Sequence, residues 1–187
     1  MRTRAATGAR ELTMAALKQE IAQERPFSSV EEEAFLNVMR TSDCLQRAFQ
    51  HRTREWGITS TQYNVLRILR GAQPQGLTCS AIGDRMITAV PDITRLLARM
   101  KPLKLIKQQR DKRDRRVVWT QISAAGLELL SKMDAVITRT PRELLGHLDR
   151  EELGEFIRLL ELARKNCIDT QAPVSCTGEK CDTAKPH

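Results

Sequence analysis

The stretch that decides the fold covers residues 77–122 and reads LTCSAIGDRMITAVPDITRLLARMKPLKLIKQQRDKRDRRVVWTQI. Its pattern predicts a short helix, a turn, a second helix and then a β-hairpin, which together make a winged helix-turn-helix. Residues 95–116 contain ten basic residues and two acidic ones. This excess of eight positive charges equals the net charge of the whole 187-residue chain, so the remainder is close to neutral. A positive field confined to one element indicates a polyanionic partner, and nucleic acid is the usual one.

The two helices of this stretch have identifiable start signals. Thr78 is placed to cap the short helix, and Leu77 and Ile82 stand at the positions of a hydrophobic staple. We expect this helix to end near residue 86. Thr88 can cap the second helix, where Pro91 is tolerated because a first-turn N–H has no helical partner to lose.

The second helix has the features of a DNA-recognition helix. Its apolar residues follow helical spacing and should face inward; they are Ile93, Leu96, Leu97 and Met100. The same geometry turns Asp92, Thr94, Arg95 and Arg99 toward solvent. The major groove admits one helix, so we expect Thr94 and Arg95 to read base edges and Arg99 to meet phosphate. A solvated basic face on a packing helix is the alternative, and the adjoining basic hairpin favours DNA.

The hairpin is expected to pair strands at residues 105–110 and 117–122 around a basic loop at 111–116. A merely solubilising turn is one reading of this loop, but arginines on a wing also suit the narrow, electronegative minor groove, with Arg113 and Arg115 outermost. Asp114 cannot approach phosphate favourably, so we expect it to hold Arg116 or a neighbour by a charge-assisted hydrogen bond and to shape the tip. The predicted DNA contacts are Thr88, Pro91, Asp92, Thr94, Arg95, Arg99, Lys112, Arg113, Arg115 and Arg116.

Long helices flank this lobe, which we place at residues 59–122. One should start at Ser28 or Ser29, with a following glutamate for a capping box, and end near residue 54. After the lobe, a helix capped by Ser123 should run until Pro141 interrupts it, and Asp149 should open another that ends near residue 165. Residues 1–27 form an extension that could be a loosely docked helix, a dimer-stabilising arm or a further DNA-contacting arm. Residues 166–187 are poor in apolar side chains and are predicted to be a disordered tail.

Several classes of protein are disfavoured by the sequence. It has no apolar run of about 18 residues and no signal peptide, so we expect a cytoplasmic protein without membrane contact. Five cysteines without a CxxC pair argue against a disulfide framework and against a structural zinc site. Phosphate-binding loops and HExxH are absent and the three histidines are scattered, so we predict neither an enzyme nor a cofactor. Aromatic residues make up only 4%, which favours duplex DNA over a single-strand stacking platform.

The chain resembles the MarR-type winged-helix transcriptional regulators over residues 31–165. The resemblance rests on Gln62-Tyr63-Asn64-Val65-Leu66, on Leu77-Thr78 followed by Ile82-Gly83, on Val90-Pro91-Asp92-Ile93-Thr94-Arg95-Leu96-Leu97, on Arg110-Asp111 with Asp114-Arg115-Arg116, and on Ile122-Ser123-Ala124-Ala125-Gly126. Each motif is weak alone, but their order and spacing together are specific. In one place the sequence departs from the family pattern, because Lys101-Pro102-Leu103-Lys104 stands where a glycine usually ends the recognition helix.

The resemblance implies a mainly α fold with a small two-stranded β-wing, dimerised through helices at residues 28–58 and 123–165. It implies a homodimer on a palindromic operator, a repressor rather than an activator, and release by a small aromatic ligand or an oxidant. Cys44 is the candidate for oxidant sensing, against the reading of a small buried or half-buried thiol. A nucleoid-type architectural DNA-binding protein, without strong sequence preference, and a winged-fold scaffold for protein partners are the alternatives.

Overall fold

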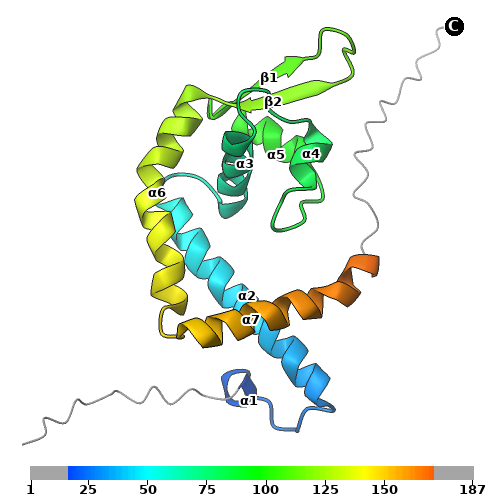
Figure 1. Ribbon diagram of the computed structural model, residues 1–187, viewed down its shortest axis with the longest axis vertical. Coiled ribbons are helices and arrows are strands. Elements are labelled where there is room, and N and C mark those ends of the chain that lie inside the picture. Colours follow the sequence, from blue (N-terminus) through cyan, green and yellow to red (C-terminus); the bar gives the residue numbers. More distant parts are fainter. Residues whose placement is uncertain (1–16, 171–187) are drawn as a thin grey trace, which may run out of the picture. The chain divides into compact units, whose positions relative to one another are not determined.

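The computed structural model describes residues 17–170 (Figure 1). By its internal contacts the chain divides between Arg47 and Ala48 into two compact units, and each is described by itself. The fold is mainly helical with one two-stranded antiparallel sheet, as the sequence predicted. Among the described residues, no helix combines the length and the apolar character needed to cross a bilayer.

The first unit contains α1 (Leu17–Glu20) and most of α2 (Val30–Arg54). The predicted capping of α2 is confirmed, because Ser29 Oγ accepts a hydrogen bond from the Glu32 amide at 3.1 Å. The Glu32 carboxylate in turn accepts one from the Ser28 amide at 2.6 Å. Arg40 Nε on α2 lies 3.2 Å from Glu20 Oε2 on α1. Most of the predicted extension helix lies outside the described residues.

The second unit holds the helices of the predicted lobe, α3 (Ser60–Gly71), α4 (Cys79–Gly83) and α5 (Ile93–Met100). Thr59 and Gln62 form a reciprocal capping box at the start of α3, and Thr78 caps α4 as predicted. The helices share one apolar core with α6, and its fully inaccessible members include Val65, Leu66, Leu69, Ile82 and Met100. Burying such side chains contributes about 1.5–3 kcal/mol each relative to exposure, which fixes the helices against one another.

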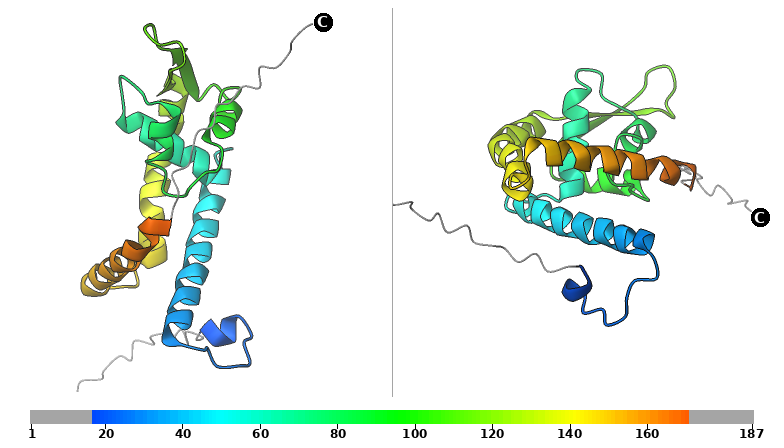
Figure 2. Two further views of the ribbon diagram at one scale, coloured as in Figure 1. Left: turned by 90° about the vertical axis from the view of Figure 1, so that its right-hand side faces the viewer. Right: turned by 60° about the horizontal axis from the view of Figure 1, so that its bottom comes forward.

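The hairpin formed by β1 (Ile106–Arg110) and β2 (Val118–Ile122), with the loop between them, is called the wing below. Its tip projects beyond α3, α4 and α5 (Figures 1 and 2). A bridge between Leu77 and Thr120 joins β2 to the segment that leads into α4. Gly76 makes this close approach feasible, because its φ is +78° and a Cβ there would lie 2.4 Å from Thr120 O.

Two helices follow the wing, α6 (Ala124–Leu145) and α7 (Arg150–Arg164). Ser123 caps α6, and Asp149 with Glu152 forms the capping box of α7, both as predicted. The predicted interruption at Pro141 is wrong, because α6 continues through it for another turn (Figure 1). The proline removes one backbone donor, whereas Glu143 in the next turn is held by Arg52 at 3.0 Å and by Arg139 at 2.6 Å.

The chain after α7 begins with a 3₁₀ helix, η1 (Lys165–Thr170), which covers the first residues of the predicted tail. The rest of that tail lies outside the described residues. No residue of α7 itself is buried, and the side chains of Ile157 and Leu162 are about half exposed, at 54% and 51%.

The turn after α5 is closed without glycine by a left-handed lysine. Lys104 has a φ of +56°, and its amide donates to Lys101 O at 2.9 Å. The Lys104 carbonyl accepts a hydrogen bond from Ser123 Oγ at 2.6 Å, which ties this turn to the start of α6. A residue with a Cβ is disfavoured in this backbone region, so the position stores conformational strain.

Replacing Lys104 by glycine should therefore stabilise the protein. Relief of the left-handed strain outweighs the added entropy of the unfolded chain, and we expect a gain of about 0.5–1 kcal/mol in the free energy of unfolding. Urea denaturation followed by circular dichroism measures this change. Lys101→Gly is the matched control, because Lys101 has a φ of −61° and the same charge is removed. A loss of stability in Lys104→Gly as large as in the control would contradict the strain.

Candidate nucleic-acid interface

The start of α5 differs from its prediction. Asp92, and not Thr88, is the N-cap, since Asp92 Oδ1 accepts a hydrogen bond from the Arg95 amide at 2.7 Å. Thr88 and Pro91 lie in the connection between α4 and α5 and are exposed. An aspartate is at least as good a cap as threonine, and its charge also complements the positive end of the helix dipole. The α4–α5 connection is consequently longer than expected, covering residues 84–92, and Asn64 Oδ1 anchors it at the Ile87 amide.

The faces of α5 agree with the prediction. Ile93, Leu96, Leu97 and Met100 are all buried, and Thr94, Arg95 and Arg99 are all exposed. The hydroxyl of Thr94 lies 3.5 Å from Cys79 Sγ on α4, so this contact lies beside the exposed face. The helix thus presents the expected polar and cationic side chains while its other face is fixed in the core.

The tip of the wing is organised by an aspartate that sequence reasoning missed. Asp111 Oδ1 accepts hydrogen bonds from the amides of Arg113 at 2.7 Å and Asp114 at 3.0 Å. Asp111 Oδ2 accepts one from Trp119 Nε1 at 3.0 Å. The sequence did contain a signal for this role. Asp111 stands at the start of the loop, and an aspartate there often accepts a hydrogen bond from the amide two residues later, as in an Asx-turn. Asp111 therefore fixes both the loop backbone and the indole ring.

Asp114 has the shaping role that was expected of it. Its Oδ1 accepts a hydrogen bond from Arg116 at 2.9 Å, through the backbone amide of that residue. The guanidinium of Arg116 is therefore left exposed to solvent. Both acidic residues of the loop use their charge on peptide N–H groups.

Hydrogen bonding lowers the pKa of Asp111 below its ordinary value. The largest cause is the bond from the Asp114 amide, followed by the bonds from the Arg113 amide and the Trp119 indole. Each donor stabilises the ionised carboxylate and loses its partner when the group is protonated.

The positive charge of α5 and the wing is not neutralised by the protein itself. Within residues 17–170, no cationic side chain from position 95 to position 116 forms an ion pair. The ion pairs that do form lie elsewhere, such as that of Arg70 on α3, whose Nη1 donates to both carboxylate oxygens of Asp134 on α6 at 3.0 and 2.8 Å. Lys112, Arg113, Arg115 and Arg116 are all exposed. This surface can therefore offer full charge to an external polyanion.

Over the described part of the chain, no group of three or more potential ligands gathers in a way that could hold a metal ion. Cys44 lies on α2 and is exposed, so the reading of it as a buried or half-buried thiol is wrong.

Comparison with known proteins places this arrangement in a family. The model of the MarR family matches residues 56–117. A MarR transcription factor from Planctomyces limnophilus is 36% identical, with 73% of this chain and 99% of that chain covered and a TM-score of 0.57. The transcriptional regulator HosA of Escherichia coli O157:H7 is 26% identical over an alignment of 121 residues, with 62% of this chain and 88% of HosA covered.

Two more distant structures share the fold. A mutant MarR from E. coli complexed with operator DNA is 17% identical, with 80% of this chain and 99% of that chain covered and a TM-score of 0.61. The organohalide-sensing regulator RdhR, bound to 2,4-dichlorophenol, is 15% identical, with coverage of 80% and 90% and a TM-score of 0.71.

The fold, with the exposed and unneutralised cations of α5 beside a basic wing, is that of a winged helix-turn-helix DNA-binding protein. The chain belongs to the MarR family of transcriptional regulators, and it is a DNA-binding regulator rather than an enzyme.

The role of Asp111 predicts how the wing responds to acid. Because its folded pKa is depressed, the hydrogen bonds of Asp111 are fully present above its unfolded pKa of about 3.9 and are lost as pH falls through the lower folded value. The indole N–H resonance of Trp119 should therefore stay constant above pH of about 4 and shift only below it. Two-dimensional ¹H–¹⁵N NMR between neutral and strongly acidic pH measures this titration.

Two controls separate this local change from global unfolding. Trp56 supplies the only other indole signal in the sequence and should remain in place while that of Trp119 moves. Asp111→Asn should shift the Trp119 resonance at neutral pH and abolish its titration. A Trp119 signal that is identical in the parent and in Asp111→Asn would exclude the hydrogen bond.

Proposed function

We propose that the protein binds an inverted-repeat operator as a symmetric homodimer, acts as a repressor, and is released by a small-molecule or oxidant signal. The observation that carries this proposal is the positive charge on α5 and the wing, where the cationic side chains of the proposed DNA contacts are exposed and form no ion pairs within the described residues. In the DNA complex, α5 lies in the major groove and the wing reaches the flanking minor groove. A dimer that occupies a promoter excludes other proteins from it, which is the physical basis of repression.

The homodimer is supported by apolar side chains that a soluble monomer rarely leaves exposed. On α2 the exposed ones include Phe35, Val38 and Met39, and on α7 they include Ile157 and Leu162. Phe35, Val38 and Met39 are three and four residues apart and therefore share one face of α2. Apolar side chains grouped on one helix face mark an interaction site, and in a self-associating protein the partner covers them. One winged lobe offers only a modest interface with DNA, whereas two related by symmetry double the contacts and fix their spacing.

Within one lobe the candidate contacts divide into two groups. Thr94 and Arg95, near the start of α5, are the proposed base readers, because the N-terminal residues of a recognition helix come closest to the base edges. Arg99 is one turn further along and contacts phosphate. On the wing, Lys112, Arg113, Arg115 and Arg116 supply charge to the minor groove and its phosphates. In the connection before α5, Thr88 and Pro91 are proposed contacts, while Asp92 acts mainly through the cap that positions Arg95.

The signal is proposed to be a small aromatic compound or an oxidant. A relative of the same fold, RdhR, is described with 2,4-dichlorophenol bound, which supports an aromatic ligand. Exposure of Cys44 is compatible with oxidation of its thiol.

Arg95→Ala should weaken operator binding and relax the base preference at one position in each half-site. A bidentate arginine–guanine contact is worth about 1–3 kcal/mol, which corresponds to roughly 5- to 150-fold in affinity. The duplex is obtained by selecting random DNA with the full chain, and a symmetric dimer should recover an inverted repeat whose half-sites lie about 10–10.5 base pairs apart. Fluorescence anisotropy then gives the affinity of the parent and the variant.

Arg150→Ala is the matched control, because Arg150 is exposed and lies at the start of α7, outside both the lobe and the possible N-terminal arm. If Arg95→Ala binds the selected duplex as tightly as this control, the assignment of α5 as the reading helix is wrong. Recovery of random sequences without an inverted repeat would instead favour an architectural DNA-binding protein.

Arg113→Ala and Arg115→Ala should weaken binding to most duplexes and flatten its dependence on salt. Each phosphate contact that is lost should reduce the slope of log K against log salt by about 0.9. Affinity measured at several sodium chloride concentrations gives this slope, with Arg150→Ala again as the control. An unchanged slope in both wing variants would remove the wing from the DNA interface.

A further inference from the structure

The wing is attached to the lobe along the edge of β2 that does not pair with β1. On that edge Leu77 and Thr120 exchange two backbone hydrogen bonds, at 2.9 and 2.8 Å. The base of the hairpin is anchored in the core, where Ile106 and Ile122 are buried. No residue from 107 to 119 is buried, and this part of the hairpin carries the basic loop (Figures 1 and 2). The contacts along the edge of β2 therefore set the direction of the wing.

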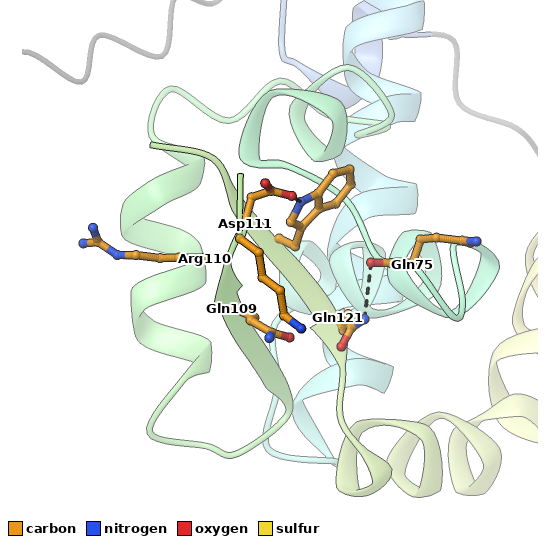
Figure 3. A pocket seen from close by; sticks show the side chains of 7 residues that line it. Gln75, Gln109, Arg110, Asp111 and Gln121 are labelled. Atoms are coloured by element: carbon orange, nitrogen blue, oxygen red, sulfur yellow. Dashed lines mark hydrogen bonds between the residues drawn. The ribbon is translucent and has the colours of Figure 1, made fainter. Parts of the chain in front are cut away.

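Gln121 makes a second attachment at the same edge. Its side-chain Nε2 donates to Pro74 O at 2.8 Å and to Gln75 O at 3.3 Å, so both protons of the amide are used. Figure 3 shows the Gln121 side chain meeting the segment that leads into α4. Among the described residues, these two carbonyls accept no other hydrogen bond. The amide of Gln121 therefore satisfies carbonyl groups that the backbone leaves unpaired.

The two attachments restrain different motions of the wing. The backbone bridge at Thr120 fixes one point on β2, and a hairpin held there alone could still turn about that point. Gln121 is the next residue along the strand, and its side chain leaves from the opposite face to the buried side chain of Thr120, so its hydrogen bonds resist this rotation. Because strand residues rise about 3.3 Å each, the basic loop begins about 10 Å beyond the bridge. A small rotation at the bridge would therefore displace every guanidinium of the loop.

We infer that Gln121 is a positioning residue for DNA binding, which holds the wing at the angle at which its cations meet the duplex. This inference rests on the proposed function of the wing. Because both amide protons of Gln121 are bound to backbone carbonyls of its own chain, it acts through Arg113 and Arg115 and not on DNA itself. A wing that is already oriented loses little conformational freedom when it binds, whereas a mobile wing has to be ordered by the duplex.

Gln121→Met is the variant that tests this role. Methionine is close to glutamine in length and lacks the amide, so both hydrogen bonds are lost without a change of charge. A hollow of about 280 Å³ lies beside Gln121 and leaves room for the thioether. Gln109→Met is the matched control, because Gln109 lies on the same face of the hairpin and is exposed. Among the described residues, the side-chain amide of Gln109 makes no hydrogen bond.

Without DNA, Gln121→Met should free the wing and leave α5 in place. Residual dipolar couplings of the backbone amides, measured on the weakly aligned full chain, report the orientation of residues 107–119 relative to α5. In the parent and in Gln109→Met, one rigid arrangement should account for both sets of couplings. In Gln121→Met, the couplings of residues 107–119 should shrink at least about twofold relative to those of α5, because the wing then samples several orientations.

With the selected duplex, Gln121→Met should weaken binding about three- to tenfold and flatten the dependence of affinity on salt, although it removes no charge. Arg113→Ala should then weaken binding at least about threefold less in Gln121→Met than in the parent, because a misplaced wing no longer makes that contact. Arg95→Ala should have the same effect in both backgrounds to within about twofold, since α5 is not displaced. Gln109→Met should bind as the parent does.

Equal effects of Arg113→Ala in the parent and in Gln121→Met would overturn the positioning role. Weaker binding by Gln121→Met with the wing still oriented as in the parent would mean that the amide contacts DNA itself, which also overturns it. A reduced effect of Arg95→Ala in Gln121→Met would show that the whole lobe is disturbed, with the same consequence. If Arg95→Ala and Arg113→Ala have no effect in the parent, the proposed function is wrong, while the couplings still decide whether Gln121 orients the wing.

Discussion

The structure depends on keeping a dense group of cations exposed on a short hairpin without neutralising them. Like charges repel, so a flexible loop bearing Lys112, Arg113, Arg115 and Arg116 would spread its side chains and lose a defined shape. Asp111 resolves this conflict because its carboxylate binds the amides of the loop and the indole of Trp119. The aspartate gives the loop its conformation, and it leaves every guanidinium available to DNA.

Support for the wing comes from the segment before α4 and from the turn after α5. The approach of Gly76 to Thr120 joins β2 to the start of α4, and Ser123 Oγ joins the turn after α5 to the start of α6. Both ends of the hairpin are therefore tied to helices whose apolar faces share one core. Two separate elements can act together on one DNA molecule only if their separation is fixed, and these short contacts hold the wing in place beside α5.

Much of this fold could be predicted because its signals are local. Helical spacing of Ile93, Leu97 and Met100 identified the buried face of α5, and the capping pairs at Thr78 and Asp149 located two helix starts. These patterns depend on residues a few positions apart, where backbone geometry alone decides which side chains meet. The strands of the wing could be predicted equally well, since β-branched residues and a basic turn mark them in the sequence.

The sequence-based predictions were wrong or incomplete where two local signals compete for one helix boundary, or where a contact with a distant residue determines the structure. Thr88 and Asp92 are both acceptable caps, and the choice of Asp92 follows from how far the connection after α4 extends over the core before α5 begins. Pro141 should end a helix by itself, but Arg52, which is far away in the sequence, holds the following turn through Glu143. The contribution of Asp111 was hidden because its indole partner lies on the opposite strand, so register had to be known first.

The acidic residues of this basic element share one physical role. Asp92, Asp111 and Asp114 each accept hydrogen bonds from backbone amides, at the start of α5 or within the wing loop. A carboxylate facing phosphate would oppose binding, and one paired with an arginine side chain would consume the charge that DNA requires. A carboxylate turned onto peptide N–H groups avoids both costs and stabilises the backbone that presents the cations. Acidic residues can therefore be retained within a DNA-binding surface as determinants of its shape, and their negative charge is spent inside the protein.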